Sequence, residues 1–152
     1  MKTPFLAGLI ATFTLTTVAY ASNAGMARSA GEFQVARSTE MMAGGAQSPL
    51  ILAEGDKIVA SETSVMVSNT NGQNVFVGEA STVAVGESNL HLINGGMAVS
   101  QPATGTTSVT VNELSFAPIA TDKAGTAGAV AIERVSENEI KVQSMGQNIN
   151  VT

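Results

Sequence analysis

A single histidine limits the catalytic chemistry that this chain could support. His91 is the only imidazole in the sequence, and there is no cysteine. A Ser-His-acid triad would therefore have to use His91, yet no Gly-x-Ser-x-Gly nucleophile turn accompanies it. Zinc sites need several histidine or cysteine ligands, which the chain cannot supply. Because His91 lies between Leu90 and Leu92, the alternation of a strand predicts that it points away from their face.

Acidic residues are the remaining candidates for catalysis. Glu133, Glu137 and Glu139 are close in sequence, as are Glu54 and Asp56. Paired carboxyl groups can hydrolyse glycosides, but such enzymes commonly add aromatic platforms, and aromatic residues make up only 4% here.

Calcium binding needs several oxygen ligands from one loop. Glu54, Asp56 and Glu62 have suitable side chains, but their spacing matches no EF-hand loop. The sequence therefore predicts a protein that is not an enzyme, with no catalytic, cofactor-binding or metal-binding residues.

Charge and composition exclude further classes of function. Seven basic residues face twelve acidic ones, for a formal net charge of −5. Nucleic acids and anionic membrane surfaces recruit clustered Lys and Arg, so neither is an expected partner. Without cysteine the chain can form no disulfide, and a core of aliphatic side chains must stabilise it.

The N-terminal segment has the pattern of a signal peptide. Lys2 precedes an uncharged apolar run from Phe5 to Tyr20, and Ala19-Tyr20-Ala21 fits a signal peptidase site. We expect residues 1–21 to form a signal helix that is cleaved after Ala21, which places the mature chain in the periplasm or outside the cell. An uncleaved membrane anchor is the alternative.

Residues 22–48 are rich in Ala, Gly, Ser and Met. This composition predicts a flexible lead-in that can add one strand over Glu32 to Ala36, with a helix over residues 34–43 as the alternative.

From Pro49 onward the hydrophobic pattern has period two, which predicts short strands that each bury one face. Asn71-Gly72 is the best hairpin turn, and Asn94-Gly95-Gly96 is another turn signal. Short strands at intervals near ten residues favour an all-β sandwich, roll or short barrel. A short β-solenoid is the alternative, although no fixed repeat length is visible. The paired apolar positions are Val65/Val67, Val75/Val77, Val83/Val85, Leu90/Leu92, Met97/Val99, Val109/Val111, Leu114/Phe116, Val130/Ile132, Ile140/Val142 and Ile149/Val151.

The order of these motifs resembles the FecR-type domain. Residues 49–58 resemble its opening, which ends in Gly-Asp-x-Ile, here Gly55 to Ile58. Residues 89–99 are similar to its hairpin of a leucine-rich strand, Gly-Gly and a small-Val strand, and residues 140–151 match its closing strands. The resemblance covers residues 48–152 and implies an exported all-β module. The family's role of relaying a transporter's state to a sigma factor needs a cytoplasmic segment before the membrane span. This chain has only four residues before its hydrophobic run, so the resemblance does not extend to that role.

These observations predict a binding or structural module of the bacterial cell envelope. Its partner would be an envelope protein or a polysaccharide, and exposed strand edges would also allow self-association. The alternatives are a periplasmic sensory domain with an uncleaved N-terminal anchor, a carboxylate-based hydrolase and a fibre-forming matrix protein.

Overall fold

The structure is a computed structural model, and it describes residues 23–68, 74–87, 89–101, 108–118, 128–145 and 149–152. These residues form strands and turns without a helix, which confirms the predicted all-β fold. No described segment is a helix long and apolar enough to cross a membrane. The strands are β1 (Asn23–Ser29), β2 (Phe33–Arg37), β3 (Glu40–Gly44), β4 (Leu50–Ala53), β5 (Lys57–Ala60), β6 (Val65–Ser68), β7 (Asn74–Val77), β8 (Ser81–Val85), β9 (Asn89–Gln101), β10 (Ser108–Val111), β11 (Leu114–Pro118), β12 (Gly128–Arg134), β13 (Ile140–Met145) and β14 (Ile149–Val151).

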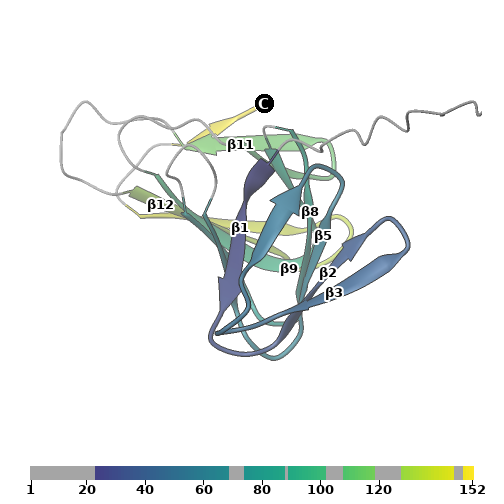
Figure 1. The fold of residues 1–152 in the computed structure, drawn as a ribbon. Coiled ribbons are helices and arrows are strands. Elements are labelled where there is room, and N and C mark those ends of the chain that lie inside the picture. Colours follow the sequence, from purple (N-terminus) through teal and green to yellow (C-terminus); the bar gives the residue numbers. More distant parts are fainter. Residues whose placement is uncertain (1–22, 69–73, 88, 102–107, 119–127, 146–148) are drawn as a thin grey trace, which may run out of the picture.

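The strands form two layers that share the long strand β9 (Figure 1). Sheet A has the order β4-β1-β6-β7-β9-β12-β13, and sheet B has the order β3-β2-β5-β8-β9-β10-β11-β14. All pairings between the described strands are antiparallel except that of β9 with β10. A solenoid would stack its coils through parallel pairs, and only one described pairing is parallel, so the solenoid alternative is wrong. The strands instead form a nearly closed roll.

Alternation along the strands builds one hydrophobic core between the layers. Leu52, Ile58 and Leu92 are among its fully buried side chains. Most of the predicted inward pairs are buried as expected, because β-branched side chains pack well on a pleated surface. Both members are buried in Val65/Val67, Val75/Val77, Val83/Val85, Leu90/Leu92, Met97/Val99, Val109/Val111 and Val130/Ile132.

The interpretation of residues 22–48 as a flexible lead-in is wrong for the described part of that segment. β1, β2 and β3 are hydrogen-bonded into the two sheets, and Ala27, Phe33 and Val35 are buried in the core. The strand expected at residues 32–36 is confirmed as β2, and the alternative helix over 34–43 is wrong. Gly44 gives one physical reason for a small residue in this segment. A Cβ at this position would lie 2.3 Å from the ring of Phe33, so glycine provides close packing at this position.

The hairpin predicted at residues 89–99 is also wrong, because β9 is one strand that bends from sheet B into sheet A. Gly95 has a φ of 80°, and the Ser81 side chain occupies the space where its Cβ would stand. The Gly96 amide donates to Ser81 Oγ at 2.9 Å, and the Gly78 amide donates to the Gly96 carbonyl at 2.8 Å. The glycines therefore let one strand turn a corner. The predicted signal segment 1–21 and the predicted turn at Asn71-Gly72 both lie outside the described residues.

Candidate functional site

His91 lies on β9, next to the parallel strand β10. Its Nδ1 is 3.0 Å from Thr110 Oγ1, the residue directly opposite in the register. This hydrogen bond joins two neighbouring strands of sheet B and gives the imidazole a cross-strand partner.

The acidic cluster at residues 133–139 surrounds the turn between β12 and β13. Glu133, Glu137 and Glu139 are all exposed. The amides of Val135 and Ser136 donate to the main-chain carbonyl of Glu139, so backbone contacts define this turn. Within the described ranges, no group of three or more His, Cys, Asp or Glu side chains could hold a metal ion.

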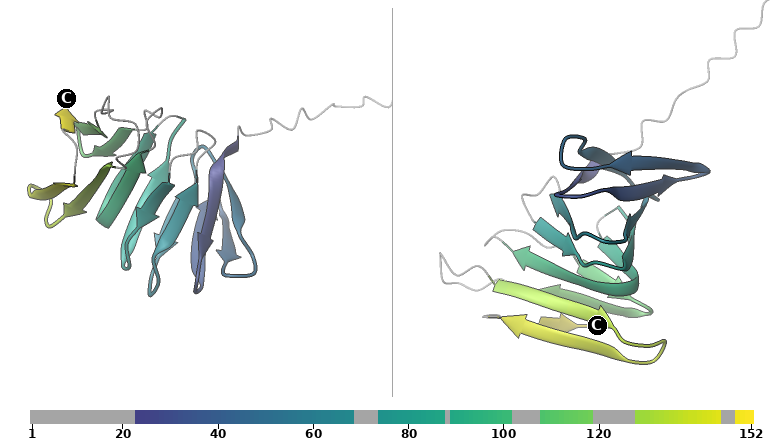
Figure 2. Two further views of the ribbon diagram at one scale, coloured as in Figure 1. Left: turned by 90° about the vertical axis from the view of Figure 1, so that its left-hand side faces the viewer. Right: turned by 90° about the horizontal axis from the view of Figure 1, so that it is seen from below.

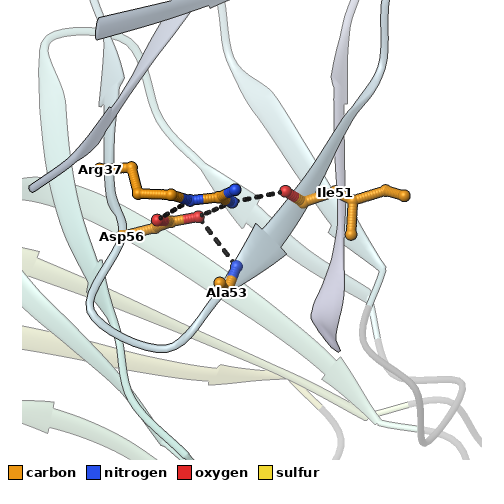
Figure 3. A network of polar contacts seen from close by, with 4 residues as sticks. All are labelled: Arg37, Ile51, Ala53 and Asp56. Carbon is orange, nitrogen blue, oxygen red and sulfur yellow. Dashed lines mark hydrogen bonds and ion pairs between the residues drawn. The ribbon is translucent and has the colours of Figure 1, made fainter. Parts of the chain in front are cut away.

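Of the acids considered for calcium, Asp56 is fully buried and binds Arg37 (Figure 3). Arg37 Nε donates to Oδ1 at 2.8 Å and Nη2 to Oδ2 at 2.7 Å. The Ala53 amide donates to Oδ2 at 2.8 Å. Burial alone raises the pKa of Asp56. The hydrogen bonds from Arg37 and Ala53, with the Arg37 charge, outweigh burial and hold the pKa below its ordinary value. The buried carboxylate thus accepts three hydrogen bonds from protein donors, which indicates a structural role.

Arg37 also donates to the carbonyl of Ile51 in β4, at 2.9 Å. The guanidinium therefore connects β2 of sheet B with β4, the edge strand of sheet A. The chain passes between the sheets here through the turn Ala53–Asp56, in which Gly55 has a φ of 88°. We name this group of Arg37, Ile51, Ala53 and Asp56 the clasp. Sequence reasoning missed it, because Arg37 was assigned to a flexible segment.

The outer face of sheet A carries a groove next to Phe76. The register places Phe76, Ala98, Ala131 and Gln143 side by side on neighbouring strands β7, β9, β12 and β13. The small side chains of Ala98 and Ala131 leave a hollow between larger neighbours. The open groove has a volume of about 600 Å³, and its polar lining includes Glu79, Glu133, Lys141 and Gln143.

A second hollow of about 530 Å³ lies on the other side of Phe76, where Arg28, Ser64 and Met66 contribute to the lining. Phe76 and Glu79 line both hollows. The Phe76 ring, 44% exposed, therefore forms a ridge between them. Arg28, Met66 and Phe76 occupy successive register positions on β1, β6 and β7, so the two hollows follow one row of residues across sheet A.

The groove combines an exposed apolar ring with hydrogen-bonding groups of both kinds. The carboxylates of Glu79 and Glu133 accept, the Lys141 ammonium donates, and the Gln143 amide does both. Such a mixed lining suits a polyhydroxylated ligand with one apolar face. The signal for Phe76 was present in the sequence, since its position between Val75 and Val77 directs it outward. The low aromatic content led sequence reasoning to discount a platform.

The polar candidates thus fall into a structural clasp, a cross-strand histidine and the lining of an open groove on sheet A. Comparison with protein-family models, curated proteins and solved structures found no match to this chain.

Proposed function

We propose that this protein is an exported, non-enzymatic binding module of the bacterial cell envelope, and that it binds a neutral polysaccharide along the groove beside Phe76. The observation that carries the proposal is the exposed Phe76 ring next to a hollow lined by Glu79, Lys141 and Gln143. The apolar face of a sugar ring can pack on the aromatic ring while its hydroxyl groups bind the polar wall.

Export is supported by the apolar run at Phe5 to Tyr20 and the Ala19-Tyr20-Ala21 site. The order of motifs that resembles FecR-type domains agrees with a module outside the cytoplasmic membrane. Mixed charges in the groove favour a neutral glycan over a polyanion, since Glu79 and Glu133 would repel clustered negative charge.

The test is a binding assay on the chain from Ser22 to Thr152 with dextran, glucomannan and xylan in solution, and with insoluble cellulose and chitin. We expect binding to at least one glycan, and Phe76→Ala should weaken it by about tenfold or more, equivalent to roughly 1.4 kcal/mol. Met41→Ala is the matched control, because Met41 is an apolar side chain on β3 of sheet B that is even more exposed than Phe76. Equal affinity of Phe76→Ala and the parent protein would contradict the site.

The same mixtures test the absence of catalysis. Release of reducing ends from any of these glycans, lost in Glu79→Gln or Glu133→Gln, would make the groove an active site and would replace this proposal with a carboxylate-based hydrolase.

A further inference from the structure

Both layers of the roll end in an open strand at the same end of the molecule. In the described part of the chain, β13 pairs with β12 alone and β14 pairs with β11 alone. The left view of Figure 2 shows these C-terminal strands in two layers at the end far from β1. Edge strands offer backbone donors and acceptors to any strand that can pair with them.

The inner faces at this end are apolar and incompletely covered. Val142 lies opposite the buried Ile132, and Val151 lies opposite the buried Phe116, so both belong to inward-facing rows. They are nevertheless 36% and 52% exposed, and Leu114, on the inward row of β11, is 44% exposed. Leu114, Val142 and Val151 each belong to a pair that the sequence predicts to point inward, and the fold leaves these three side chains uncovered. We name the end formed by β11, β13 and β14 the open end.

At the opposite end of the roll the inward side chains are covered, since Phe33 of β2 and Leu52 of β4 are buried. There Arg37 donates to the Ile51 carbonyl of the edge strand β4, and the turn Ala53–Asp56 joins the two layers. In the described part of the chain β3 and β4 also pair with one strand each, so the two ends differ in how far their inward apolar side chains are covered.

We propose that the open end is a homodimer interface, in which a second copy of this chain continues both sheets at once. A two-fold axis perpendicular to the layers would pair β13 with β13 and β14 with β14, each antiparallel. The second copy is the favoured occupant because its own two layers have the same separation, so both edges meet a partner strand together. Exposed Leu114, Val142 and Val151 would then be buried across the axis, as in the apolar centre of a homodimer interface.

Cysteine cross-linking tests this interface in a chain that has no native cysteine. Val142→Cys and Gln143→Cys place one thiol each on β13, where a β13–β13 pair brings equivalent residues close to the axis. Met41→Cys is the matched control on β3, the edge strand of sheet B at the opposite end. Under mild oxidation, at least one β13 variant should give tenfold more disulfide-linked dimer than the control.

Light scattering of the parent protein gives a second readout that needs no substitution. We expect the mass to double with increasing concentration. A mass that stays at one chain up to millimolar concentration overturns the proposal, as does equal cross-linking at Met41→Cys and at both β13 variants. Circular dichroism of each variant verifies that the β fold is retained. None of these measurements depends on glycan binding, so the groove and the dimer can fail independently.

Discussion

The guanidinium of Arg37 holds the buried carboxylate of Asp56 through two parallel hydrogen bonds of 2.8 and 2.7 Å. Bidentate pairs of this kind are among the stronger polar contacts in proteins. Here the pair fixes the turn through which the chain leaves sheet A and enters sheet B, and Arg37 also binds one carbonyl of the edge strand β4, that of Ile51. Arg37 thus links β2 of sheet B, the turn at Asp56 and β4 of sheet A at the end of the roll opposite the open end.

Replacing Asp56 by Asn should destabilise the protein by about 2–3 kcal/mol, because the charged partner of Arg37 is lost while a buried polar group remains. Partial exposure of Arg37 keeps the loss near the lower end of the range for buried pairs, since water can solvate the guanidinium. Urea denaturation monitored by circular dichroism measures the change. Glu54→Gln in the same turn is the control, and this exposed site should change the free energy of unfolding by less than about 0.5 kcal/mol. Equal values for the two variants would contradict a structural role for the clasp.

The stabilisation by Asp56 should depend on pH in the acid range. Its pKa is lowered in the folded state, so the unfolded chain binds the proton more readily, with a pKa of about 3.9. The stabilisation is therefore complete well above pH 4 and is lost as pH falls below that value through the folded-state pKa. The difference in unfolding free energy between the parent protein and Asp56→Asn should shrink from pH 7 to pH 3. A difference that stays constant over this range would show that the charge of Asp56 contributes nothing.

The alternation of aliphatic residues was sufficient to predict that the apolar pairs between Val65 and Phe116 lie in strands, because burial on one face of a strand requires period two, but not that β9 is one continuous strand. The same pattern identified the outward position of Phe76 without indicating that small neighbours hollow out the sheet beside it. The clasp could not be predicted, since the pairing of Arg37 with Asp56 depends on which strands become neighbours. The glycines misled the interpretation in two ways. Gly44 is typical of a flexible segment in the sequence, but it allows close packing against Phe33. Gly95 has the sequence context of a hairpin turn, but it allows a bend within the single strand β9.

Gly95→Ala should destabilise the bend of β9 by more than Gly55→Ala destabilises the turn after β4. Both glycines have positive φ, 80° and 88°, so both substitutions carry backbone strain of about 1 kcal/mol. A Cβ on Gly95 would also lie 2.7 Å from the Ser81 Cα, whereas one on Gly55 meets nothing within 4 Å. We expect a total loss of about 3 kcal/mol or more for Gly95→Ala, since overpacking adds to the strain. Thermal unfolding of the two variants measures the difference, and equal melting temperatures would contradict the corner packing.

A chain that begins at Pro49 should fail to fold cooperatively, because the first three strands belong to the core. Their loss removes the buried side chains of Ala27, Phe33 and Val35 and leaves Asp56 without Arg37. It also exposes β6 and β5, which pair with β1 and β2. We expect no sigmoidal transition in urea and strong binding of a hydrophobic dye. The chain from Ser22 is the control and should unfold in one step. Cooperative unfolding of the shorter chain would restore a domain boundary near residue 48.

The proposed export predicts a mature chain that begins at Ser22. The first described strand begins at Asn23, so cleavage after Ala21 would remove the signal segment and leave β1 whole. Strand β1 pairs with β4 and β6, which means that cleavage even a few residues further along would remove partners of β4. Intact mass measurement of the protein from the periplasm or medium of an expressing bacterium locates the N-terminus. A mass that starts at Met1, together with recovery in the membrane fraction, would favour the alternative of an anchored sensory domain.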